Sequence, residues 1–443
     1  MLNSGLRSES WGWLLFTCFL VGGCRSSVSP LGPTDGPGKP AAAPAGGAAP
    51  AGGAIEAAST RAVSRSAAGA IPESVLNEHG MTTLWTKQPA KAEGAIRNVY
   101  LLPEGLFAVT RPDPDVRSWR LIRYDLETGL PSWFYELEEP LEHAPVAYHY
   151  GTSASGQRPD ELYLLQKDVL RCLDLQYGAD MWRVRLRFPV SSAPVVDDNQ
   201  LYVGSYDRRI YAMPKKTGLD SWTYITGGEI TSAGTVGEGG HLYFTSTDKY
   251  VYRLEPASGW VNGKSWRFAT GARILGSPVF FSRWIFVGST DFKLYCFEMD
   301  GTRAWEFPAE ASVSETPVVM SLKPDKPMVF CISQESRGGR EKRIAWALDA
   351  KTGQTYWHRD DVSQVIGIGR RAVYLLPDTR AVQGGRQLIA VDAMKGDELF
   401  SIPVDRFEII PTNDAEHGTN ARTRGVVYLV SKAGLVQAIR EKP

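Results

Sequence analysis

The sequence predicts an all-β fold, an eight-bladed β-propeller of four-stranded antiparallel blades that is closed by pairing of its N- and C-terminal strands. Two repeated patterns indicate this fold. A small residue followed by Pro-Val opens a unit, and Gly-x-x-x-Trp closes it. The units recur about every forty to fifty residues, the period of four-stranded blades rather than of helical repeats. Copies of the two patterns are Ala144–Val146, Ala193–Val195, Ser277–Val279 and Thr316–Val318, and Gly129–Trp133, Gly178–Trp182, Gly218–Trp222, Gly301–Trp305 and Gly353–Trp357.

The stretch from Ser192 to Tyr224 shows how one unit forms four strands. Short runs of β-branched and aromatic residues alternate with polar turns, which is typical of an antiparallel sheet. Pro194 cannot donate to a ladder, so we expect it at the start of the first strand. Gly218 follows three polar residues and can take the positive φ that a tight turn requires. Trp222 then lies on the last strand.

A third-strand pattern recurs eight times and sets the number of blades. The last copy has no fourth strand after it, whereas Met81–Trp85 carries the tryptophan of a fourth strand with no repeat before it. We therefore expect Thr82–Thr86 to pair beside Leu435–Ile439, which closes the ring and removes an open edge. The eight copies lie near Tyr124, Leu173, Ala212, Tyr252, Cys296, Ala347 and Ala390 and at Leu435–Ile439.

Tryptophans at the closing positions are predicted to pack between neighbouring blades. An indole there buries a large apolar area without a ligand, so we interpret these residues as structural and not as a cofactor box. The predicted blade-docking residues are Trp85, Trp133, Trp182, Trp222, Trp266, Trp305 and Trp357.

The first residues of the chain predict export and a lipid anchor. An apolar run at Trp11–Val21 is too short to span a bilayer and ends in Gly-Gly before Cys24. This pattern resembles the lipobox of bacterial lipoproteins, which implies that Cys24 is acylated; the alternative is an ordinary cleaved signal peptide with an incidental cysteine. Arg25 favours the outer membrane over the inner one. The predicted divisions are a signal peptide at 1–24, a Pro/Ala/Gly-rich tether at 25–74 and the propeller at 75–443.

Composition argues against several classes of function. Lys plus Arg and Asp plus Glu are both 49, so the formal net charge is zero and no nucleic-acid surface is expected. Cys172 and Cys296 both occupy the third strand of their repeats, where other copies carry a small apolar residue, and are interpreted as buried thiols. With Cys331 the body has three cysteines, an odd number, and no disulfide framework is implied.

The repeat, for example VGSYDRRIYAMPKKTGLDSW from Val203, resembles the PQQ-type β-propeller repeat over nearly all of the body. A lipoprotein made of one such propeller is similar to the BamB family, whose members belong to the machinery that assembles β-barrels in bacterial outer membranes. The resemblance implies a non-catalytic, monomeric scaffold facing the periplasm. Its implied partner is an envelope protein such as the barrel-assembly pore protein, held by loops at one rim.

The alternative is a PQQ-dependent quinoprotein dehydrogenase, in which the same repeat occurs, or a propeller that binds a quinone or another small ligand. A resemblance to the quinoprotein alcohol dehydrogenases would imply adjacent cysteines, a calcium site and a catalytic aspartate in a longer chain. This sequence matches none of these features. His143 and His149 form no metal-binding pattern. Asp207, Asp248 and Asp291 recur at one repeat position, which predicts turn-capping carboxylates and not a catalytic acid. We therefore expect no cofactor, no metal and no enzymatic activity.

Partner contacts are expected where the repeat is interrupted, since loops on a rigid scaffold carry function. Arg187 and Phe188 precede Ala193-Pro194-Val195, in a region where the BamB family places partner-contacting residues ahead of its own Ser-Ala-Pro. Ordinary loop variation is the alternative for every such segment. The other candidate loops are Arg111–Trp119, Gly151–Asp160, Arg337–Arg343 and Asn413–Arg424.

Overall fold

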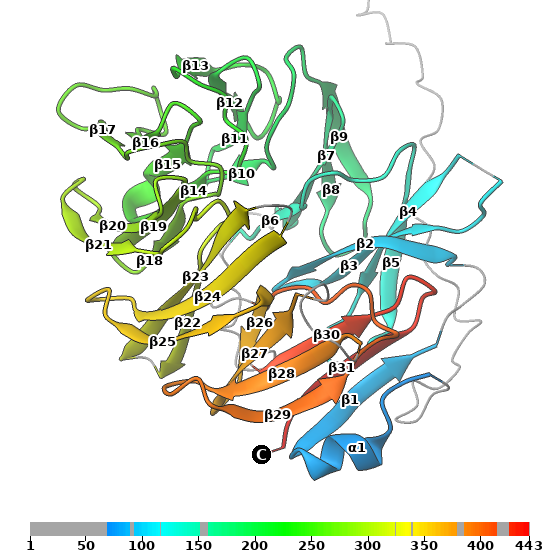
Figure 1. The fold of residues 1–443 in the computed structure, drawn as a ribbon. Helices are drawn as coiled ribbons and strands as arrows, with labels where there is room; N and C mark the ends of the chain where they lie inside the picture. The colour runs from blue at the N-terminus through cyan, green and yellow to red at the C-terminus, as the bar shows by residue number, and fades with distance from the viewer. Residues whose placement is uncertain are drawn as a thin grey trace, which may run out of the picture. The chain divides into compact units, whose positions relative to one another are not determined.

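Eight β-sheets follow one another along the chain, and the last sheet is completed by a strand from its beginning (Figure 1). The computed structural model describes residues 69–88, 93–115, 117–150, 158–323, 325–337, 340–378, 385–413 and 425–442. Among these residues, no helix has the length and apolar character needed to cross a membrane. We number the sheets as blades 1 to 8 in chain order.

Blades 1 to 4 each contain four antiparallel strands, in the sheet order in which the strands follow in sequence. Blade 1 is β2 Ala95–Leu102, β3 Gly105–Arg111, β4 Trp119–Tyr124 and β5 Pro131–Leu137; blade 2 is β6 Val146–Tyr148, β7 Glu161–Gln166, β8 Val169–Asp174 and β9 Asp180–Arg185; blade 3 is β10 Val195–Val196, β11 Gln200–Gly204, β12 Arg209–Pro214 and β13 Trp222–Ile225; blade 4 is β14 Thr235–Val236, β15 Leu242–Thr245, β16 Tyr250–Leu254 and β17 Trp266–Ala269, with the short 3-10 helix η1 Glu238–Gly240.

Blades 5 to 7 repeat this arrangement, and blade 8 joins the two ends of the described chain. Blade 5 is β18 Val279–Phe281, β19 Trp284–Ser289, β20 Lys293–Glu298 and β21 Arg303–Pro308; blade 6 is β22 Val318–Lys323, β23 Lys326–Arg337, β24 Arg340–Asp349 and β25 Thr355–Asp360; blade 7 is β26 Val362–Ile368, β27 Ala372–Pro377, β28 Gln387–Asp392 and β29 Glu398–Pro403; blade 8 is β30 Val426–Val430, β31 Val436–Glu441 and β1 Met81–Lys87.

The burial of each strand follows its place in the blade. A central strand such as β7 is buried at every position, because neighbouring blades cover both faces of its sheet. An outermost strand such as β13 alternates between half-buried and exposed residues. Buried hydrophobic residues of the described chain form eight clusters, one between each pair of adjacent blades, including the pair formed by blades 8 and 1.

The predicted closure is confirmed. β1 pairs antiparallel with β31, with Thr83 opposite Ile439 and Thr86 opposite Gln437. The innermost strand position of blade 8 is reduced to one bridge in the described residues, where Ile409 and Val430 exchange two backbone hydrogen bonds of 3.0 and 2.9 Å. The eight-bladed all-β fold is therefore correct, although its last blade has a shortened inner strand.

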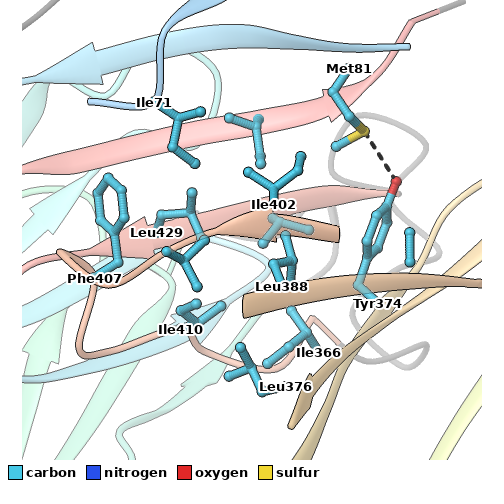
Figure 2. Packing of buried hydrophobic residues seen from close by; sticks show 14 of the residues in the cluster. Ile71, Met81, Ile366, Tyr374, Leu376, Leu388, Ile402, Phe407, Ile410 and Leu429 are labelled. Carbon is cyan, nitrogen blue, oxygen red and sulfur yellow. Dashed lines mark hydrogen bonds between the residues drawn. The ribbon is translucent and has the colours of Figure 1, made fainter. Parts of the chain in front are cut away.

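The junction of blades 7 and 8 also holds the first described residues (Figure 2). Ile71 lies in this cluster, and its backbone exchanges hydrogen bonds of 2.9 and 3.1 Å with the Gln437 side chain. The short helix α1, Glu73–Glu78, buries Leu76 and places Glu73 where it accepts a hydrogen bond from the Thr82 hydroxyl. Ile71 and Glu73, which the sequence places in the tether, thus contact the body; the predicted divisions otherwise stay predictions.

Candidate interaction face

One face of the ring carries two kinds of segment: the turns between the second and third strands, and the connections that lead from each blade to the next. We call it the crossover face. In blade 3 the turn is Tyr206–Arg208, in blade 4 Thr247–Lys249 and in blade 5 Thr290–Phe292. The opposite face carries the first-to-second and third-to-fourth turns.

Aspartates hold the crossover turns in shape, as the sequence predicts. The Asp207 carboxylate accepts hydrogen bonds from the backbone N–H of Arg209 at 3.1 Å and from the Tyr211 hydroxyl at 2.7 Å. Asp248 and Asp291 accept the hydroxyls of Tyr252 and Tyr295 in the same way, at 2.6 and 2.7 Å. These carboxylates therefore already accept hydrogen bonds from groups of the same blade.

The same contacts shift the pKa of the Asp207 and Tyr211 side chains. Burial acts to raise the pKa of Asp207, but hydrogen bonds from Tyr211, Ser205 and Arg209 outweigh it and hold that pKa below its ordinary value. Burial, followed by the hydrogen bond to Asp207, raises the pKa of Tyr211 to about 12. At neutral pH the pair is thus an ionised carboxylate and a neutral phenol.

Backbone hydrogen bonds link the turns of blades 3 to 5 to the connections between blades. The connection before each blade accepts the N–H of the next turn: Tyr206 donates to Pro189 at 3.1 Å, and Thr290 donates to Arg273 at 2.9 Å. The connection after each blade donates back, as Thr226 does to the carbonyl of Arg208 at 2.8 Å. Side chains on this face therefore stand on a backbone that is already fixed, which reduces the entropy lost on binding.

Exposed apolar and basic side chains gather on these segments. Tyr206, Ile225, Leu275 and Phe292 are large hydrophobic residues exposed to 53%, 60%, 38% and 54%. With the exposed cations of the same segments they form what we call the crossover patch: Arg187, Tyr206, Arg208, Ile225, Lys249, Arg273, Leu275 and Phe292.

The two partner-contact residues predicted from sequence differ in position. Arg187 is exposed and belongs to the crossover patch. Phe188 is 8% exposed, lies in the core between blades 2 and 3, and stacks on Tyr211 with 3.6 Å between ring centroids. The expectation that Phe188 offers a surface contact is wrong, because its ring completes the blade interface.

The other predicted segments are described only in part. Cys24 and residues 151–157 and 414–424 lie outside the described residues. Arg337 and Arg340 are backbone partners at the end of the β23–β24 ladder, which has ten paired positions and is longer than the corresponding ladders of blades 2 to 5. This hairpin extends on the crossover side, so the candidate loop Arg337–Arg343 includes the end of β23 and the start of β24.

Each predicted docking tryptophan sits on the outermost strand of its blade. The Trp85 indole N–H donates to the Leu126 carbonyl at 2.9 Å, and Trp357 donates to Ala393 at 2.9 Å, in both cases on the next blade. Trp133, Trp222, Trp266 and Trp305 make the same bond to Leu175, Pro256, Met299 and Ala350. Trp182 packs in a tilted arrangement on Tyr163 of its own blade, and its ring lies against Gly218 of blade 3, where an added Cβ would be 3.2 Å from it.

The thiols of the body are buried. Cys172, Cys296 and Cys331 are free cysteines within the described ranges, and burial raises the pKa of each, for Cys331 to about 12. Protonated buried thiols are poor nucleophiles and metal ligands. The described residues contain no group of three or more His, Cys, Asp or Glu side chains placed to hold a metal ion.

The fold and its repeat define the class: a PQQ-like-repeat β-propeller. The family described as "Outer membrane protein assembly factor BamB" matches residues 120–264 and 247–442, which together cover more than half of the chain. The chain therefore belongs to the BamB family.

Individual relatives are distant. The outer membrane protein assembly factor BamB of Nitrosomonas eutropha is 24% identical over 221 residues, 49% of this chain and 51% of that protein, so the match spans about half of the relative's length. The crystal structure of BamB from Moraxella catarrhalis superposes with a TM-score of 0.55 at 15% identity, covering 81% of this chain and 99% of that one. The computationally designed Ika8 protein gives a TM-score of 0.52 at 11% identity, covering 80% and 98%. These two structures support the fold alone.

Proposed function

We propose that the protein is a non-catalytic scaffold of outer-membrane protein assembly, and that it holds an envelope protein partner against the crossover face. Family membership supports the assembly role. The observation that carries the choice of face is the crossover patch, where arginine, tyrosine and phenylalanine stand exposed on hydrogen-bonded backbone. All three residue types are enriched at protein–protein interfaces, and arginine and tyrosine also at interface hot spots.

The proposed location follows from the N-terminal residues. Cys24 carries the lipid, the outer membrane holds the anchor, and the segment up to about residue 68 links the anchor to the propeller. The propeller faces the periplasm as a monomer and needs no cofactor. The barrel-assembly pore protein is the proposed partner, because the family acts in assembly of outer-membrane proteins.

Affinity purification of the tagged full-length protein from membranes tests this proposal. The expected result is recovery of outer-membrane assembly proteins, reduced in an Arg187→Glu variant and retained in a Lys216→Glu variant. Lys216 is an exposed lysine in the third-to-fourth turn of blade 3, on the opposite face. Recovery without any assembly protein would contradict the role, and equal losses in both variants would contradict the face.

A further inference from the structure

The second-to-third turns of blades 3, 4, 5 and 8 all end in a residue with left-handed backbone. Arg208, Lys249 and Phe292 end the second-to-third turns of blades 3 to 5 with φ of 68°, 72° and 70°. In blade 8 the corresponding residue is Gly434, φ 99°. Arg208, Lys249 and Gly434 all donate their N–H to the serine that begins the turn, at 3.2, 3.1 and 2.9 Å. Glycine therefore fits the turn that carries arginine and lysine in blades 3 and 4.

A side chain at such a position is unfavourable for folding. Left-handed backbone brings the Cβ atom close to the following carbonyl, and glycine avoids this contact. On the opposite face of blades 1 to 7 the left-handed residue of each third-to-fourth turn is a glycine: Gly129, Gly178, Gly218, Gly259, Gly301, Gly353 and Gly396. Non-glycine residues with positive φ are seven in the described chain, and six lie on the crossover face; the exception is Ser282.

All three side chains are exposed to solvent. Arg208 and Lys249 are exposed and make no side-chain hydrogen bond or ion pair within the described residues, and Phe292 is 54% exposed. Some exposed cations elsewhere do have a carboxylate partner, as Arg283 has in Glu298 at 2.8 Å. Non-glycine residues held in left-handed backbone cluster at functional sites, such as ligand-binding positions.

Charge decides which partner fits. From Arg187 to Phe292 the crossover face presents Arg187, Arg208, Lys249 and Arg273 as unpaired cations, judged over the described residues, and one exposed carboxylate, Glu229. The turn aspartates are already hydrogen-bonded. The whole chain has a net charge of zero, so this excess of positive charge is confined to part of the surface. A basic surface with aromatic residues complements an acidic segment that carries an apolar anchor.

We propose that the left-handed side chains Arg208, Lys249 and Phe292 are a contact row for an acidic, aromatic-containing segment of a protein partner, and that they occupy glycine positions for this purpose. This inference rests on the proposed function, in which the crossover face holds a protein partner. It adds the chemistry of the partner's segment and the residues that contact it. Arg208 and Lys249 pair with carboxylates, and Phe292 packs on the partner's apolar side chain.

The test compares stability and binding in one variant. The probe is a labelled peptide of the repeat Glu-Glu-Phe, titrated by fluorescence anisotropy into the full-length protein, with a Lys-Lys-Phe peptide as the charge control. The triple variant Arg208→Gly, Lys249→Gly, Phe292→Gly is expected to keep or raise Tm while binding at least about tenfold more weakly. Ser282→Gly, which relieves the same backbone strain on the opposite face, is expected to bind like the unmodified protein.

Several outcomes would overturn the proposal. They are absence of peptide binding by the unmodified protein, equal binding by the triple variant, and a lower Tm in that variant. Binding to phosphatidylglycerol vesicles that is lost in the triple variant, without loss of peptide binding, would assign the row to a lipid surface instead. The peptide titration needs no assembly protein, so its failure is distinct from a failure to recover assembly proteins from membranes.

Discussion

The indole N–H of Trp133 in blade 1 donates a hydrogen bond of 3.0 Å to the carbonyl of Leu175 in blade 2, 42 residues further along the chain. Gly178, in the same turn as Leu175, lies under the indole ring with φ of 67°. The Gly-x-x-x-Trp repeat therefore forms contacts between blades, because the tryptophan of one copy packs against the glycine of the next copy.

Replacing Gly178 by alanine should destabilise the protein strongly. Its Cβ would lie 2.7 Å from the Trp133 ring, so the cost of left-handed alanine, about 1–2 kcal/mol, adds to about 1–3 kcal/mol of overpacking. Gly80→Ala is the matched control, with φ of 67° and nothing within 4 Å of the added Cβ. Urea unfolding should give a larger loss for Gly178→Ala; equal losses would mean that the indole contact adds nothing.

The tryptophans should differ in their contribution to stability according to burial. Trp133 is 2% exposed, so Trp133→Ala should cost about 5 kcal/mol, near the upper end for deletion of a large aromatic side chain. Trp222 is only half-buried, so Trp222→Ala should cost nearer 3 kcal/mol. Chemical denaturation of both variants measures the two losses in free energy of unfolding. A greater loss for Trp222→Ala than for Trp133→Ala would be inconsistent with the packing described.

Acid should weaken the turn of blade 3 through Asp207. Its pKa is lowered in the folded state, so ionised Asp207 contributes stability above the unfolded-state pKa, about 4, and this contribution is lost as the pH falls through the lower folded value. Asp207→Asn lacks that titration. The gap in urea midpoint between the native protein and this variant should narrow from pH 6 to pH 3, and a constant gap would contradict the assigned hydrogen bonds.

Membrane attachment should depend on Cys24. Without the thiol there is no site for acylation, so Cys24→Ser should move the protein from the membrane fraction to the periplasmic extract. Cys172→Ser is the control, since this thiol is buried between blades 2 and 3. Full membrane retention of Cys24→Ser would support the alternative of an anchor, or a partner, that does not involve lipid.

The repeat was sufficient to predict the blades and their closure, because each blade must bury both faces of its sheet and so carries the same apolar pattern. The site was harder to predict. Phe188 looks like a loop residue in sequence, and only the fold shows that it stacks on Tyr211. Arg208, Lys249 and Phe292 were missed, although each follows a predicted turn-capping aspartate at the place where a three-residue turn favours glycine.

The central claim, that the crossover face holds a partner from outer-membrane assembly, is tested most directly by photo-crosslinking in living cells. A photoreactive phenylalanine analogue replaces Arg187 on the crossover face or Lys216 on the opposite face, both of which are exposed. Irradiation should join an outer-membrane assembly protein to the chain from position 187 and not from position 216. Adducts from position 216 alone, or none from position 187, would contradict the claim.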